Sequence, residues 1–139
     1  MTTDPRTGMT VLDEDACWSL LGSASIARVA VAIAGDVEVF PVNIVVDERT
    51  VVFRTGEGTK LAASVIAPRV AVEADGVDPA RGRAWSVVVK GRAERLERFT
   101  DIYRAEDLAL PSWTEHPKQW FVRVYCDQIT GRSFQTASA

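Results

Sequence analysis

Six runs of apolar and β-branched residues, joined mostly by short turns, dominate this sequence of 139 residues. Gly35 and Asp36 separate the first two runs, and a four-residue turn separates the second from the third. Short connections of this kind join antiparallel strands, and few helical segments interrupt them. The pattern therefore predicts a mainly β fold, either a barrel or a sandwich. The predicted strands cover residues 26–34, 37–46, 51–55, 70–74, 85–96 and 120–126.

Three short helices are predicted between these strands. Acidic residues at 13–15 favour the positive end of a helix that ends at Gly22. The other two helices cover residues 60–66 and 98–110, and each ends shortly before a proline.

The length of the chain suits one domain with its own hydrophobic core. Residues 11–135 are expected to form this domain, with flexible tails at 1–10 and 136–139. The net charge of −3 argues against nucleic acid as a partner, because nucleic-acid-binding surfaces are usually basic.

The two cysteines, Cys17 and Cys126, are far apart and form no CxxC motif. This usage predicts two free thiols in a reducing cytoplasm. No apolar run approaches the ~20 residues that span a membrane, and the polar N-terminal residues resemble no secretion signal. We therefore expect a cytoplasmic protein that has no membrane partner.

Both faces of the second predicted strand are apolar. Val39 and Val45 lie on one face, whereas Phe40, Val42 and Ile44 lie on the other. A closed barrel buries only one face of each strand, so a helix or a second subunit has to cover the other face. The pattern thus predicts a homodimer.

The third predicted strand runs directly into a loop with two glycines, and a predicted helix follows. Glycines let a ligand approach the backbone, and Thr59 is a suitable N-cap for a helix whose free N–H groups attract an anion. Arg54 and Lys60 place positive charge on either side of the loop. The segment fits a phosphate monoester, and it equally fits an ordinary turn with exposed charges.

Two further strand positions carry residues that strands usually avoid or that could contact a flat ring. Pro41 and Asn43 interrupt an apolar run, and the Asn43 amide could serve the edge of a heterocycle or be satisfied by backbone at a bulge. Trp85, followed by Ser86, could pack beside a flat ring or belong to the core. His116, the only histidine, is expected at the surface. One histidine cannot build a typical metal site, so no metal is predicted.

Taken in order, these motifs resemble the pyridoxamine 5′-phosphate oxidase-like family of FMN-binding split-barrel proteins. The likeness is greatest to its short bacterial branch, which includes nitroimidazole-reductase-like proteins. It runs from about Leu12 to Phe134 and covers nearly the whole chain. The motifs that carry it lie at residues 41–43, 53–61, 68–73, 85–93 and 129–132.

The resemblance implies a six-stranded antiparallel split barrel of Greek-key type that dimerises with FMN at the subunit interface. It implies that Arg54, Thr55, Thr59 and Lys60 hold the FMN phosphate. The segment Pro41, Val42 and Asn43 would lie along the flavin ring. Trp85 and Ser86 would approach the same site, from the same chain or from its partner.

The implied function is an FMN-dependent oxidoreductase that takes hydride from NAD(P)H or a similar donor and reduces a small oxidised acceptor. The Arg-x-His element of the vitamin B6 oxidases is replaced here by Gly131-Arg132-Ser133-Phe134, which argues against that substrate. The alternatives are a deazaflavin-dependent reductase on the same barrel, a non-catalytic flavin-binding protein and an interaction module without a cofactor. No residue is singled out as catalytic.

Overall fold

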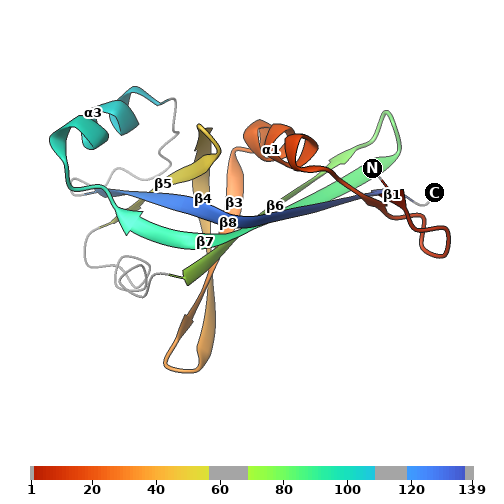
Figure 1. The fold of residues 1–139 in the computed structure, drawn as a ribbon, viewed down its shortest axis with the longest axis horizontal. Helices are drawn as coiled ribbons and strands as arrows, with labels where there is room; N and C mark the ends of the chain where they lie inside the picture. Colours follow the sequence, from red (N-terminus) through yellow and green to blue (C-terminus); the bar gives the residue numbers. More distant parts are fainter. Residues whose placement is uncertain (1, 57–68, 109–118, 137–139) are drawn as a thin grey trace.

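A computed structural model describes residues 2–56, 69–108 and 119–136 (Figure 1). Eight strands and two helices lie within these ranges. They are, in chain order, β1 (Thr2–Thr3), β2 (Thr10–Val11), α1 (Glu14–Ser23), β3 (Ile26–Ile33), β4 (Asp36–Asp47), β5 (Thr50–Gly56), β6 (Arg69–Asp78), β7 (Arg83–Arg95), α3 (Phe99–Asp107) and β8 (Gln119–Gln135).

Six of these strands close into an antiparallel ring. The order around the ring is β8, β5, β4, β3, β6 and β7, and β7 pairs with β8 to close it. The chain crosses over after β5, because β6 pairs with β3 and not with β5. The prediction of a mainly β, six-stranded split barrel is confirmed.

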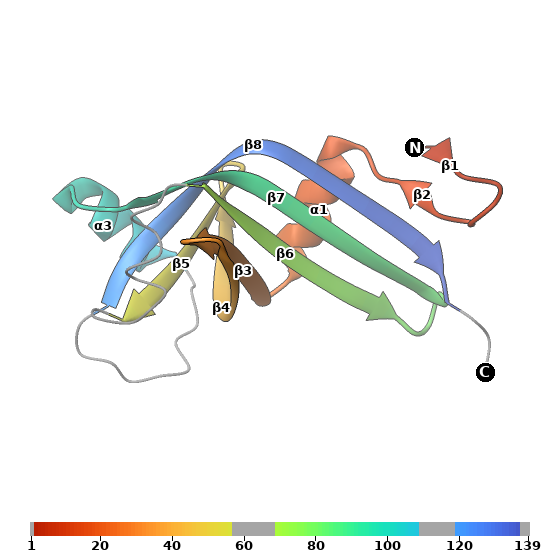
Figure 2. The same cartoon turned by 90° about the horizontal axis from the view of Figure 1, so that it is seen from below.

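The inside of the ring is the hydrophobic core. Residues that alternate along the strands are fully buried, among them Val29, Phe53, Val72 and Val122. Helix α1 packs against β8 and contributes buried side chains to the same core cluster, including Leu21. Figure 2 shows this helix lying beside β7 and β8, long strands that extend beyond the ring together with β6.

Strand β8 is longer than the sequence predicts. We expected a strand at 120–126, whereas β8 continues to Gln135. The polar residues after Cys126 break the apolar alternation, but the pairing with β7 shifts register at Lys90/Gly91 and then resumes. This bulge leaves Asp127 without a pairing partner on β7. The sequence pattern failed here because a bulge moves side chains to the other face without ending the strand.

The extension of β8 also gives the N-terminus a partner. We expected a flexible tail at 1–10, whereas β1 pairs with β2, and β2 pairs with β8. Gly8 turns the chain between the two short strands with φ of 70°, a conformation that glycine adopts without strain. The predicted helices at 13–22 and 98–110 correspond to α1 and α3, and the predicted helix at 60–66 lies outside the described residues.

Helix α3 covers an apolar patch on the outside of the ring. The patch contains Val52 and Phe121 of the barrel together with Leu96, and Ala105 and Ile102 of the helix pack against it. Val45 of β4 packs against the same cluster. Helix α3 therefore covers part of the outer apolar face of β4, the second strand predicted from the sequence.

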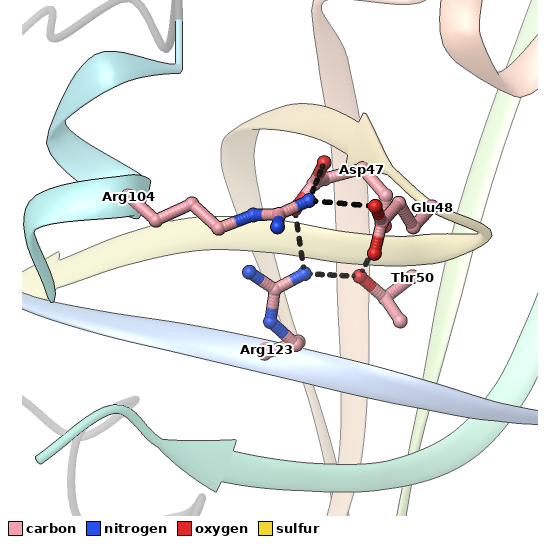
Figure 3. Close-up of polar contacts among 5 residues, drawn as sticks. All are labelled: Asp47, Glu48, Thr50, Arg104 and Arg123. Atoms are coloured by element: carbon pink, nitrogen blue, oxygen red, sulfur yellow. Dashed lines mark hydrogen bonds and ion pairs between the residues drawn. The ribbon is translucent and has the colours of Figure 1, made fainter. Parts of the chain in front are cut away.

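An ionic network ties α3 to the turn between β4 and β5 (Figure 3). Arg104 of α3 lies 3.1 Å from Asp47 and 3.0 Å from Glu48. Arg123 of β8 donates to the same Asp47 carboxylate at 3.1 Å and also bonds the Thr50 hydroxyl. The Asp47 and Arg123 side chains are only 12% and 11% exposed, so each depends on the other for its charge balance.

Asp47→Asn should lower the free energy of unfolding by between about 1 and 2 kcal/mol at pH 7. The hydrogen bond from Arg104, with further help from Arg123, lowers the pKa of the Asp47 carboxyl below its ordinary value of 3.8. The contribution is therefore complete at neutral pH and is lost as the pH falls below about 4. Urea unfolding should show the full difference at pH 7 and a smaller difference at pH 3. Glu48→Gln, at a 77% exposed side chain, should have a much smaller effect, and equal effects would contradict the network.

Both cysteines are free in the structure. Cys17 is buried in the core, and Cys126 is partly exposed on β8. Burial raises the pKa of both thiols, so neither is poised as a nucleophile at neutral pH. Thiol titration without reductant should therefore find both groups after denaturation and should find Cys126 reacting before Cys17 in the native protein. Loss of both thiols would indicate a disulfide.

Candidate functional site

Strand alternation sorts the predicted site residues onto two faces. On β4, Ile44 is buried in the core and Val42 packs against the core, so Pro41 and Asn43 lie on the outer face of the barrel. Pro41 lacks an N–H, and among the described strands only β3 pairs with β4 at this position. A proline is tolerated on such an open side of a strand.

The same rule separates the other candidates. Arg54 lies on the outer face, whereas Thr55 lies with buried Phe53 on the inner face and is itself buried. Ser86 lies on the outer face of β7. Trp85 packs against the core, with its indole over the backbone of Gly76. The inner-face position of Trp85 matches the alternative in which it is a core residue. Thr59, Lys60 and His116 lie outside the described residues.

Asn43 of β4 and Arg54 of β5 lie at the end of the ladder that joins these two strands. The β4–β5 ladder ends at the pair Ile44 and Phe53, and Asn43 and Arg54 are the next residues beyond it. On the far side of β4, Asn43 pairs with Ile26 of β3. A row of outward-facing residues thus crosses three strands in the order Arg54, Asn43 and Ile26.

Two polar atoms in this row are buried and lack a hydrogen-bond partner among the residues that the structure describes. They are Oδ1 of Asn43 and Nε of Arg54. The Arg54 guanidinium lies over the ring of Phe121, 5.0 Å from its centroid. Burying an unpaired polar group costs about 1–3 kcal/mol, so two such atoms in one row mark a place where a ligand can complete the hydrogen bonds.

The next row on the same face carries a charged cluster that the sequence analysis missed. Arg28 of β3 pairs with Pro41 on one side and with Glu73 of β6 on the other. Its Nη1 lies 3.5 Å from Glu73 Oε1 and 3.1 Å from Asp75 Oδ2. Burial raises the pKa of Glu73 to about 7, helped by the hydrogen bond and charge of Asp75 and opposed by Arg28. The sequence could have indicated part of this cluster, because Glu73 and Asp75 are two residues apart and two such residues lie on the same face of a strand.

Ser86 extends this face by one more strand. It pairs with Asp75 of β6 and with Arg132 of β8. The structure therefore brings Pro41, Asn43, Arg54 and Ser86 onto one continuous outer face. Across residues 2–56, 69–108 and 119–136, no group of three His, Cys, Asp or Glu side chains could hold a metal ion. Neither described helix has the length and apolar character to cross a membrane.

A separate pocket of about 360 Å³ lies between α1, the β4–β5 turn and β8. Glu14, Trp18, Arg49 and Cys126 are among the residues that line it. Arg49 is held there by ion pairs with Glu14 and Asp15. None of the outer-face residues named above lines this pocket, so it is distinct from the candidate site.

The closed six-stranded ring and its outer-face site define a split-barrel protein. A family model described as pyridoxamine 5′-phosphate oxidase matches residues 13–133. The chain therefore belongs to the pyridoxamine 5′-phosphate oxidase family.

Three individual proteins are also similar to this chain. Rv3129 of Mycobacterium tuberculosis is 46% identical over 90 residues, which are 65% of this chain and 80% of that protein. The solved structure of a FAD-binding protein from Mycobacterium smegmatis is 40% identical with a TM-score of 0.81, and the match covers 91% of this chain and 100% of that one. A FAD-binding protein from Mesorhizobium loti is 25% identical with a TM-score of 0.71, over 94% of this chain and 99% of that one.

Proposed function

We propose that this protein binds a flavin on the outer face of its barrel and acts as a flavin-dependent oxidoreductase on a small oxidised acceptor. FMN is the proposed cofactor, and NAD(P)H is the proposed electron donor. Family membership supports a flavin in general, and the two FAD-binding relatives make FAD a second candidate for the same site. The alternative cofactor is a deazaflavin, whose ring differs from that of FMN and FAD.

The observation that carries this proposal is the pair of unpartnered atoms in neighbouring strands. Asn43 Oδ1 is an acceptor, and the edge of an isoalloxazine ring presents an N–H donor. Arg54 Nε–H is a donor, and a phosphate presents acceptor oxygens. The residues present therefore fit a molecule with a heterocyclic ring at one end and a phosphate at the other.

Each residue of the row would have a separate task. Arg54 would bind the phosphate, aided by Thr59 and Lys60 as the sequence predicts. Asn43 would orient the ring edge, and the exposed Ile26 would provide an apolar surface under the ring. The flavin, when bound, supplies the hydride chemistry, and the protein supplies binding and orientation. Ser86 would contribute its hydroxyl from the adjoining part of the face, in the same chain or from a second copy.

We further propose that the active form is a homodimer. Val37 and Val39 on the outer face of β4 are 72% and 57% exposed, and β3 places only Ala32 and Ala30 opposite them. The β3–β4 hairpin that carries them projects from the rest of the molecule (Figure 1). An exposed apolar face of this kind is typical of a subunit interface.

Light scattering at micromolar concentration should give twice the chain mass of 15.2 kDa. Val39→Asp should shift the protein toward the monomer, because it places a charge in the apolar face of the proposed interface. Val77→Asp is the matched control, since Val77 is 64% exposed on a different strand. A native protein that is monomeric at this concentration would rule out the dimer.

Two measurements test the proposed function: the absorbance and fluorescence of a bound flavin, and the rate of NAD(P)H oxidation. We expect the purified protein to bind FMN or FAD, with quenched flavin fluorescence and a shifted visible spectrum. Oxidation of NAD(P)H with a bound flavin would support an oxidoreductase, and binding without turnover would support a flavin carrier. Binding of a deazaflavin in preference to both flavins would favour the alternative. Failure to bind any of the three would overturn the proposed function.

A further inference from the structure

The cluster of Arg28, Glu73 and Asp75 lies beside the proposed flavin site but takes no part in the contacts assigned above. Its three side chains come from two strands, and Arg28 contacts both carboxylates. These two contacts hold the guanidinium in place. The Arg28 side chain is 45% exposed, so the guanidinium still faces the outer surface. The cluster therefore holds one guanidinium and two acidic groups in fixed positions on the face that carries Asn43.

The register of the strands places this charge within reach of a ring on β4. Neighbouring strands lie about 4.8 Å apart, and a tricyclic ring system is wider than that. A ring lying along Pro41 and Asn43 therefore also covers the part of β3 that pairs with them. The residues of β3 at these positions are Arg28, opposite Pro41, and Ile26, opposite Asn43.

Reduction changes the charge of such a ring. A hydride from the nicotinamide donor brings two electrons and one proton, and the donor leaves as the oxidised nicotinamide. The ring system then carries one additional negative charge until a second proton arrives. A fixed cation beside the ring stabilises this reduced form more than the neutral oxidised form.

We propose that Arg28, held by Glu73 and Asp75, sets the reduction potential of the bound flavin by stabilising its reduced form. This inference rests on the proposed function, because it requires a flavin ring on the outer face of β4. Glu73 and Asp75 act through Arg28, as positioning residues, and also moderate its charge. Among the described residues, the charged groups that face Glu73 are Arg28 and Asp75, while β7 places the apolar Val88 opposite it.

The proposal predicts opposite shifts of the flavin midpoint potential for two substitutions that each remove one charge from the cluster. Arg28→Gln removes the cation, so it should weaken binding of the reduced flavin about tenfold more than binding of the oxidised flavin. For a two-electron couple this ratio lowers the midpoint potential by about 30 mV. Glu73→Gln removes a negative charge from the cluster, so it should raise the potential at pH 8, where the native carboxyl is mostly ionised. Arg28→Lys keeps the charge and should restore most of the native potential.

The experiment is a pair of fluorescence or absorbance titrations of the apo-protein, with oxidised FMN in air and with chemically reduced FMN under anaerobic conditions. FAD is titrated in parallel. Arg69→Gln is the matched control, because Arg69 is also an exposed strand arginine that pairs with a carboxylate, that of Asp127. It should leave the ratio of the two affinities unchanged.

The outcomes separate this inference from the proposed function. If the native protein binds neither FMN nor FAD, the proposed function fails and the inference fails with it. If flavin binds and the affinity ratio of Arg28→Gln equals that of the native protein, only the role of Arg28 is wrong. If Arg28→Gln does not fold, Glu73→Gln decides, and a potential that is unchanged or lower at pH 8 would overturn the proposal.

Discussion

Gly91→Ala should lower the free energy of unfolding by about 3 kcal/mol or more. A Cβ atom at position 91 would lie 1.8 Å from the backbone carbonyl oxygen of Tyr125 and 3.3 Å from the Cα of Cys126. Both neighbours are backbone atoms of β8, so no side-chain rotation can relieve the contact. The substitution would have to push β7 and β8 apart at the bulge, where the two strands close the barrel.

Urea unfolding at a fixed protein concentration measures this loss, since an associating protein has a concentration-dependent stability. Gly22→Ala is the control, because a Cβ there meets nothing within 4 Å and the residue lies inside α1. Alanine is favoured over glycine in a helix by about 1 kcal/mol, so this variant should be as stable as the native protein or more stable. A stable, native-like Gly91→Ala would show that β7 and β8 do not meet as closely as described.

Arg54→Ala should weaken FMN binding by about ten- to a hundredfold. A hydrogen bond to a charged group contributes roughly 1.5–3 kcal/mol, and about 1.4 kcal/mol corresponds to a tenfold change in affinity. Of the residues predicted to hold the phosphate, Arg54 lies on the outer face, and its Nε has no hydrogen-bond partner within the described part of the chain. Riboflavin has no phosphate, so its affinity should be nearly the same for the variant and for the native protein.

Fluorescence titration of the apo-protein with both ligands measures this difference. Arg6→Ala is a suitable control, since its side chain is 87% exposed in the β1–β2 turn. Arg104 is a poor control, because its ion pairs with Asp47 and Glu48 attach α3 to the barrel. If FMN and riboflavin lose the same affinity in Arg54→Ala, the arginine supports the fold around the ligand and does not bind the phosphate.

The candidate site was only partly predictable from the sequence. Pro41 and Asn43 stood out because their residue types are unusual within a strand, and the structure places both on the outer face. Trp85 was recognised as a possible ring contact, yet it packs against the core. The cluster around Arg28 was missed because its partners on β6 are 45 and 47 residues away in the sequence.

The sequence by itself determined where the six strands of the ring begin and where the two described helices lie. Alternation of apolar residues and the turn at Gly35 are local properties, set by the backbone preferences of a few neighbouring residues. The resemblance to a family added the split-barrel architecture and the expectation of a flavin.

Only the tertiary structure decided how the strands pair across long separations. The bulge at Gly91, the pairing of β2 with β8 and the pairing of β3 with β6 all depend on register between distant segments. Register is set by the packing of the whole core, because a shift of one residue would turn every side chain of a strand to the opposite face. For the same reason, the cluster of Arg28, Glu73 and Asp75 exists only once β6 has paired with β3.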